Sequence, residues 1–193
     1  MNRDNQMEKG GHRIKEGIIQ AIRGTGDLFV AMMDTVSELV SNGLDDAGEV
    51  GASMIDSITE VAGNAVHGAV EVGSDIGQAA KGIIVGVLRG TRETGDAALK
   101  RVGHTARTVI RQTAWAGADV AHATKGLVQG AIFTAKESGI AAAHAASSAA
   151  QAAVEAAEEL GSAAAQKVRR AVTGTIDGIK VVLKEPFKHQ SRR

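Results

Sequence analysis

The stretch GSDIGQAAKGIIVGVLRGTRETG, residues 73–95, is one unit of a repeat that runs through most of the chain. In steps of 22 residues a glycine recurs, at Gly51, Gly73, Gly95, Gly117, Gly139 and Gly161. A second column, counted in the same steps, holds aliphatic side chains: Leu44, Val66, Leu88, Ile110, Ile132, Val154 and Ile176. An internal repeat decides the architecture, so it is interpreted before any local feature.

The period of 22 residues is twice eleven, and an eleven-residue repeat is typical of long amphipathic helices. Eleven residues over three turns give about 3.67 residues per turn, which keeps one face aligned along a helix and favours a right-handed supercoil. The apolar stripe covers about five positions in eleven, which is wider than the seam of a dimeric coiled coil. We therefore predict an all-α protein in which both columns are helix–helix packing positions.

The repeat shows no phase break. Residues 29–182 hold seven consecutive units (7 × 22 = 154) without an insertion or a deletion. Because a loop usually interrupts the phase of a helical pattern, this predicts one very long helix or a few long helices, packed as a right-handed coiled coil or a bundle. A continuous helix of that length would span about 230 Å. The alternative is a chain that folds back at a glycine-rich point, such as residues 68–77.

A further set of glycines is spaced by four residues and would form a ridge on a second helix face. Such a ridge lets another backbone approach closely. The alternative is that low-complexity drift left small residues on a solvated face. The glycines of this ridge are Gly82, Gly86, Gly90, Gly126, Gly130, Gly174 and Gly178.

Charge and composition divide the chain into three parts. Residues 1–13 are polar and predicted to be a flexible N-terminus, residues 14–183 form the helical region, and residues 184–193 form a basic tail behind the helix-ending Pro186. Within the helical region, residues 29–72 hold eight acids and no Lys or Arg, residues 73–138 hold nine bases and five acids, and residues 139–168 are rich in alanine. This asymmetry predicts that the acidic part lies beside the basic part of the same or another chain.

The composition argues against several function classes. Cysteine and tyrosine are absent, Trp115 is the single tryptophan, and the net charge is zero. No histidines have the spacing of a metal pair, and neither a phosphate-binding loop nor a nucleophile elbow is present. We therefore expect no metal, cofactor, small-molecule substrate or nucleic acid, and no enzymatic activity. Trp115 is either a contact anchor or a tolerated exposure.

Location follows from the same features. The N-terminus lacks the apolar stretch of a secretory signal, and no run of 18 apolar residues exists. We expect a cytoplasmic protein, with a peripheral place on a membrane or granule as the alternative.

The repeat resembles that of eleven-residue-repeat amphipathic proteins, which include group 3 late-embryogenesis-abundant proteins and the exchangeable apolipoprotein or perilipin type. The resemblance rests on the phase of residues 29–182 and on the stretches GQAAKG (77–82) and AQAAVEAAEEL (150–160). It implies a helix that folds on a lipid, granule or protein surface. The Val, Ile and Gly content of residues 76–88 is closer to right-handed hendecad coiled coils.

The first functional hypothesis is a non-enzymatic structural protein. Its helices would self-associate through the apolar stripe into a homo-oligomer, sheath or filament. The alternative is an amphipathic coat on a lipid, membrane or storage-granule surface, similar to apolipoproteins or phasins, or a stress protectant.

Overall fold

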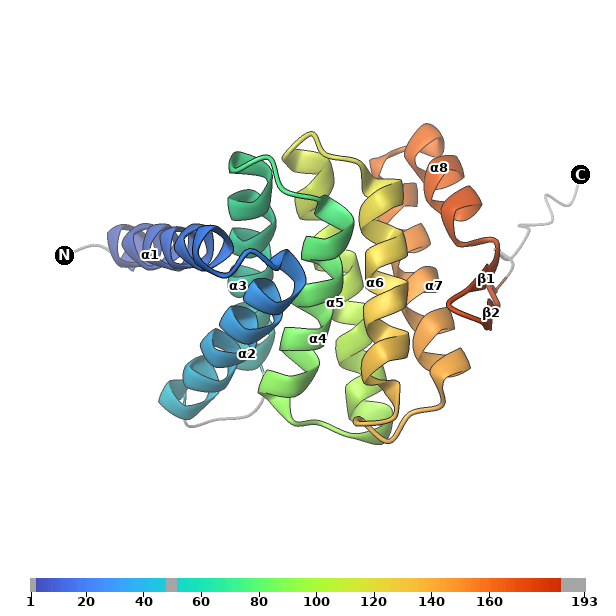
Figure 1. The fold of residues 1–193 in the computed structure, drawn as a ribbon, viewed down its shortest axis with the longest axis horizontal. Coiled ribbons are helices and arrows are strands. Elements are labelled where there is room, and N and C mark those ends of the chain that lie inside the picture. Colours follow the sequence, from blue (N-terminus) through green and yellow to red (C-terminus); the bar gives the residue numbers. More distant parts are fainter. Residues whose placement is uncertain (1–2, 48–51, 185–193) are drawn as a thin grey trace, which may run out of the picture.

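The computed structural model describes residues 3–47 and 52–184, and within them the side chains of residues 11–24, 26–43 and 54–184. The described chain forms eight helices followed by a β-hairpin (Figure 1). The elements are α1 (Arg3–Thr25), α2 (Leu28–Ala47), α3 (Ala52–Glu71), α4 (Ile76–Thr91), α5 (Gly95–Trp115), α6 (Val120–Ala135), α7 (Ala142–Leu160), α8 (Ser162–Val172), β1 (Gly174–Ile176) and β2 (Ile179–Val181). The all-α class and the bundle packing are thus confirmed.

The prediction of one very long helix, or a few long ones, is wrong. The helices are 11 to 23 residues long, and each 22-residue unit from residue 52 to residue 160 corresponds to one helix and an adjoining turn, whereas the last unit holds α8 and the hairpin. The phase survives because every turn is short and fits inside the unit, so helix and turn together keep the period. An unbroken phase therefore did not require an unbroken helix.

The repeated glycines lie at the turns between helices: Gly73, Gly117, Gly139 and Gly161 follow a helix end, whereas Gly95 is the first residue of α5 and the left-handed residue after α4 is Arg92. Gly73, Gly95, Gly117 and Gly139 have φ between +60° and +72°, and Gly161 has φ +120°. Such angles suit glycine, which has no Cβ, and a left-handed residue is the usual way to finish a helix.

The same turn geometry recurs along the chain. The N–H of Ser74 donates to the carbonyl of Ala69, that of Ala118 to Thr113 and that of Ile140 to Ala135, all at 2.9 Å. These bonds run from one residue past a left-handed glycine back over five residues, as in a Schellman turn. They satisfy carbonyls that the helix end leaves unpaired.

Aspartates begin two of the helices at equivalent positions 44 residues apart. The carboxylate of Asp75 accepts the N–H of Gln78 at 2.7 Å, and that of Asp119 accepts the N–H groups of Ala121 and His122 at 2.9 and 3.2 Å. An aspartate in this position pairs amides that have no partner inside the helix. Sequence and local structure thus agree on a helix-and-turn unit.

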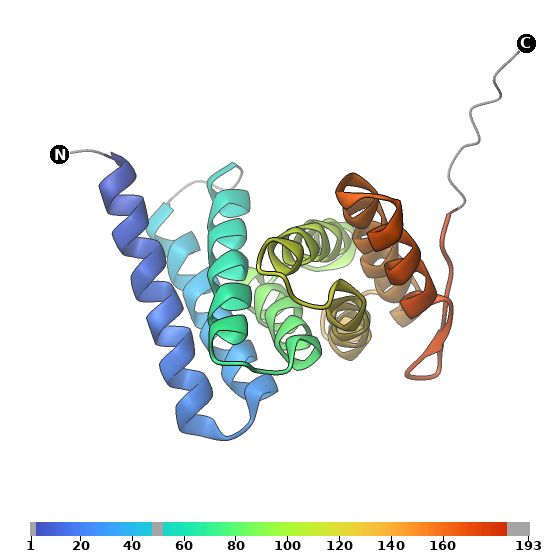
Figure 2. The same cartoon turned by 90° about the horizontal axis from the view of Figure 1, so that it is seen from above.

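The helices stack in two layers. The even layer holds α2, α4, α6 and α8, and the odd layer holds α1, α3, α5 and α7; each helix packs on the helix two places along in its own layer, as well as on its sequence neighbours. Contacts within a layer join residues about 45 to 50 positions apart, such as Arg89 with Glu137 and His67 with Gln112. The stack runs from α1 at one end to α8 and the hairpin at the other (Figures 1 and 2). This is the arrangement of an α-solenoid.

The core lies between the layers and consists almost entirely of alanine, valine and isoleucine. Ile83, Ile84, Ile110 and Leu127 are among its largest fully buried side chains. Because aromatic residues contribute little to the core, the helices must approach closely to bury enough area.

Both ends of the predicted domain plan differ in the structure. The first helix begins at Arg3, so most of the expected flexible segment 1–13 is helical. The last helix ends at Val172, and residues 174–181 form an antiparallel hairpin in place of the helix predicted to reach residue 183. The basic tail 184–193 lies outside the described residues except for Lys184.

Candidate interaction surfaces

The predicted glycine ridge lies where the even helices meet. A Cβ at Gly82 would lie 2.9 Å from the carbonyl oxygen of Phe29, and one at Gly86 would lie 2.7 Å from that of Met33. A Cβ at Gly90 would lie 2.8 Å from the carbonyl oxygen of Ser37. The three glycines of α4 therefore form a track in which the backbone of α2 rests.

The track continues one step along the layer and then stops. A Cβ at Gly126 would clash with the carbonyl group of Gly77, and one at Gly130 would lie 2.8 Å from the carbonyl oxygen of Lys81. Gly174 and Gly178 do not belong to it, because they sit in the hairpin with φ +111° and +79° and no atom within 4 Å of their Cβ positions. Their helical spacing was coincidental.

The two repeat columns differ in packing within the described residues: the aliphatic column is buried or half-buried, and the glycine column makes no helix–helix contact. In the aliphatic column the structure buries Val66, Leu88, Ile110 and Val154 and leaves Ile132 and Ile176 half-buried. The prediction that the glycine column packs helices together is corrected, because no atom lies within 4 Å of the Cβ positions of Gly73, Gly95, Gly117, Gly139 and Gly161. Gly51 and the side chain of Leu44 lie outside the described part of the chain.

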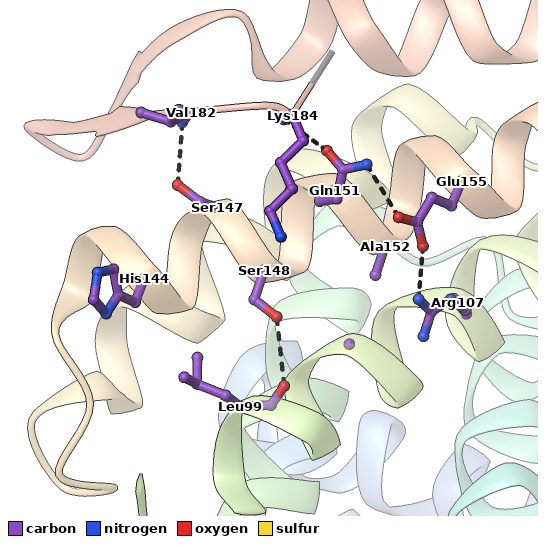
Figure 3. A pocket seen from close by; sticks show the side chains of 11 residues that line it. Leu99, Arg107, His144, Ser147, Ser148, Gln151, Ala152, Glu155, Val182 and Lys184 are labelled. Atoms are coloured by element: carbon purple, nitrogen blue, oxygen red, sulfur yellow. Dashed lines mark hydrogen bonds and ion pairs between the residues drawn. The ribbon is translucent and has the colours of Figure 1, made fainter. Parts of the chain in front are cut away.

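A groove of about 320 Å³ opens on the odd layer between α5, α7 and the segment that follows β2 (Figure 3). Its floor is small or apolar, with Leu99 and Gly103 from α5 and Ala152 from α7. Its polar rim consists of Arg107, His144, Ser147, Ser148, Gln151, Glu155 and Lys184. The groove therefore combines an apolar base with hydrogen-bonding walls, as ligand sites generally do.

An extended piece of the chain itself already occupies one wall of this groove. The backbone N–H of Val182 donates to Ser147 Oγ at 3.1 Å, and the N–H of Lys184 donates to Gln151 Oε1 at 3.0 Å (Figure 3). Alternate residues of an extended chain lie about 6.6 Å apart, and residues four apart on a helix lie about 6 Å apart. Side chains at i and i+4 of α7 thus match alternate amides of an extended peptide.

A charged pair closes the far end of the groove. Arg107 donates to Glu155 at 2.6 Å, and Gln151 Nε2 donates to the other carboxylate oxygen at 3.0 Å. Burial acts to raise the pKa of Glu155, but these hydrogen bonds and the charges of Arg107 and Lys184 outweigh it, so the pKa lies below its ordinary value. Glu155 is therefore an anionic acceptor with its geometry fixed.

The even layer carries an aromatic cluster between cations. The rings of Phe29 and Phe133 meet edge to face, with centroids 5.6 Å apart. Lys81 Nζ lies 4.8 Å from the Phe29 centroid, and Arg89 lies over Phe133 while it pairs with Glu137 at 3.0 Å. Because Phe133 remains 49% exposed, the cluster is an accessible surface feature.

Trp115, flagged from the sequence, is the last residue of α5 and is 70% exposed. Leu160 is the last residue of α7 and is also exposed. Parallel helices of one layer end at the same edge, so these side chains project from one rim of the odd layer.

No motif or repeat column marks Ser147 and Gln151, which lie in the alanine-rich segment. Only the return of residues 182–184 makes them binding residues. Among the residues whose placement is described, no group of three or more His, Asp or Glu side chains could hold a metal ion, and no described helix is long and apolar enough to cross a membrane.

Comparison with known proteins adds no relative. No family model matches the chain, and no curated protein matches it either.

Proposed function

We propose that this protein is a non-enzymatic helical-repeat scaffold that binds an extended segment of a protein partner in the groove between α5 and α7. The observation that carries the proposal is the pair of hydrogen bonds by which Ser147 and Gln151 hold the alternate amides of Val182 and Lys184. Stacked helical repeats present long lateral surfaces of this kind to partners.

Residues 182–184 fill only one wall of the groove, and the rest of it is open. Leu99, Gly103 and Ala152 line its floor, and the Ser148 hydroxyl beside them makes a long bond of 3.4 Å to the Leu99 carbonyl. A partner segment lying there would contact an apolar strip for one side chain and polar groups on either side. Glu155 favours a cationic side chain at that end, where Lys184 already contributes to its electrostatic environment.

A substitution at Gly103 tests the groove without disturbing the core. A Cβ at this position would meet its nearest atoms at 3.8 Å, so a leucine side chain would extend into the open volume. The matched control is Gly17→Leu on α1, where no atom lies within 4 Å of the Cβ position. Both changes also remove a helix-interior glycine, so their effects on helix propensity are alike.

The experiment is selection of a phage-displayed random peptide library on the full chain, followed by calorimetric titration of the enriched peptides. We expect micromolar binding to the native chain and to Gly17→Leu, and none to Gly103→Leu. Absence of enriched peptides, or peptides that bind all three chains equally, would overturn the proposal.

Self-association into an oligomer, sheath or filament stays a prediction, as does a coat on a lipid or granule surface. Both predictions rest on the width of the apolar stripe. Part of that stripe is buried within the chain, because Val66, Leu88 and Ile110 pack against neighbouring helices. Sedimentation of the lipid-free protein measures the first. For the second, helicity should rise when liposomes are added if the surface completes the fold.

A further inference from the structure

A second groove, of about 380 Å³, lies on the even layer between the first turns of α6 and the last turns of α8. Lys125 from α6 and Lys167 and Arg170 from α8 converge on it. The remaining lining residues are Asp119, Ala121, His122 and Ala171. The groove is distinct from that between α5 and α7, which lies on the odd layer.

Elsewhere in the stack, basic side chains face carboxylates between helices of one layer. Asp75 of α4 faces His122 of α6 at 3.0 Å, and Arg111 of α5 pairs with Glu159 of α7 at 2.6 Å. The partners lie 47 and 48 residues apart. Complementary charges at this spacing favour the register in which the helices stack.

The step from α6 to α8 differs, because Asp119 lies 48 positions before Lys167 but forms no ion pair with it in the described structure. The residue 48 positions after His122 is Arg170, and Lys125 and Lys167 lie in the same groove. All three permanent cations are exposed, and within the described part of the chain none of them has a carboxylate within ion-pair distance. Cations brought together without an acid repel one another, and an anionic ligand would remove that cost.

The one acid at this groove does not neutralise it. Asp119 Oδ1 is engaged with the N–H groups of Ala121 and His122 at the start of α6. One carboxylate stands against three permanent positive charges, so the groove keeps a surplus of two. A single phosphate monoester carries about that charge with the opposite sign near pH 7.

We propose that the groove between α6 and α8 binds a phosphate monoester. Arg170 would donate its planar fork to two phosphate oxygens, and the ammonium groups of Lys125 and Lys167 would neutralise the remaining charge. The ligand is a soluble phosphate ester or the head group of an anionic lipid, because both present the same chemistry at an exposed groove.

The test uses two probes that share one head group. Glycerol 3-phosphate is the soluble probe, and phosphatidylcholine vesicles containing phosphatidic acid are the membrane probe. Titration of the native chain with glycerol 3-phosphate, followed by amide NMR, should shift the resonances of Ala121, His122 and Lys167 in a saturable way. This readout needs no substitution and therefore does not depend on the folding of a variant.

The variants separate a site from a general charge effect. Lys167→Gln with Arg170→Gln should weaken binding of the probe by about tenfold or more, since each removes a charged hydrogen-bond donor. The matched control is Lys100→Gln with Lys136→Gln, which removes the same charge at exposed positions outside the groove and should leave binding unchanged.

Each outcome decides the proposal. Saturable binding of glycerol 3-phosphate alone assigns a soluble ligand, and binding of vesicles alone, lost in the groove variant, assigns a lipid head group. Binding of both probes assigns the shared phosphate chemistry. The proposal is overturned if the native chain binds neither probe, or if the groove variant and the control lose binding equally.

Discussion

Helix-interior glycines of this chain differ in how closely a neighbouring helix approaches them. Gly86 has an ordinary helical backbone and sits against α2, where a Cβ would lie 2.7 Å from the carbonyl oxygen of Met33. Gly103 also lies within a helix, but its nearest neighbours would be 3.8 Å from a Cβ. The spacing of four residues picked out Gly86 but not Gly103, and only the packing shows which of the two a methyl group would disturb.

Alanine substitution should therefore change stability in opposite directions at these two positions. Gly103→Ala should raise the free energy of unfolding by about 0.5–1 kcal/mol, because alanine favours the helix. Gly86→Ala should lower it by about 1–3 kcal/mol, because the added methyl group forces α4 away from α2. Urea unfolding measures both, and equal changes at the two positions would contradict the close approach.

His104 makes stability depend on pH. Burial, followed by the charge of Arg101 and then those of Arg107 and Arg111, lowers the pKa of His104 below 6.5, although a backbone hydrogen bond at Ile55 opposes this. The neutral ring contacts Thr59 Oγ1 at 3.1 Å. The folded side chain thus resists a proton that the unfolded chain accepts.

The direction in which the free energy of unfolding changes with pH follows from proton binding at His104. Below about pH 6.5 the unfolded chain binds more protons at this site than the folded one, so acidification favours unfolding. Above that pH both forms are neutral and the site has no effect. His104→Gln should flatten the fall in the free energy of unfolding between about pH 7.5 and 5.5, as urea titrations at both values would measure. An unchanged slope would place the dependence on other groups.

At the scale of the element, the 22-residue period was correctly found and wrongly interpreted. The columns through Gly73 and Leu88 are real, but the period belongs to one helix with its turn. The sequence contains two signals that a new helix starts within the repeat. Asp75 and Asp119 each come two residues after a column glycine, and an aspartate there is a helix-start signal. A hendecad phase and a helix-and-turn unit of equal length give the same column pattern, so phase alone could not separate them.

The turns themselves make this interpretation testable. Gly117 has φ +72° and no atom within 4 Å of its Cβ position, so its replacement costs backbone strain without a clash. Gly117→Ala should destabilise the protein by about 1–2 kcal/mol, and Gly117→Asn by less, because asparagine tolerates the left-handed region. If residue 117 were inside a continuous helix, alanine would stabilise it, and thermal unfolding would show the opposite sign.

At the scale of the whole molecule, the acidic segment 29–72 lies beside the basic segment 73–138 of the same chain, as one of the two predicted arrangements. Helix α2, from the acidic segment 29–72, packs on α4 of the basic segment 73–138, and α3 packs on α5 in the same way. The groove between α5 and α7 was beyond sequence reasoning, because it depends on where residues 182–184 return. Side chains within a repeat can be aligned from sequence, whereas the docking of a non-repeating end cannot.

The aliphatic column contributes to the core of a single chain. Leu88 is 3% exposed in the core, so Leu88→Asp should cost at least about 3 kcal/mol and abolish cooperative unfolding at ambient temperature. The control Ile55→Asp, at a residue that is 41% exposed, should change stability by less than about 1 kcal/mol. A well-folded monomer of Leu88→Asp in circular dichroism and sedimentation would show that the column is not the core.

Small-angle X-ray scattering distinguishes the stacked chain from the rod that an unbroken phase first predicted. A compact chain of 193 residues has a radius of gyration of about 16 Å, and an elongated stack lies a few ångström above it. A continuous helix of about 230 Å would give roughly 66 Å, which is its length divided by the square root of twelve. We expect the small value for the dilute chain, because the turns at Gly73, Gly117 and Gly139 reverse the chain before any partner is needed. A radius of gyration that rises steeply with protein concentration would instead indicate self-association.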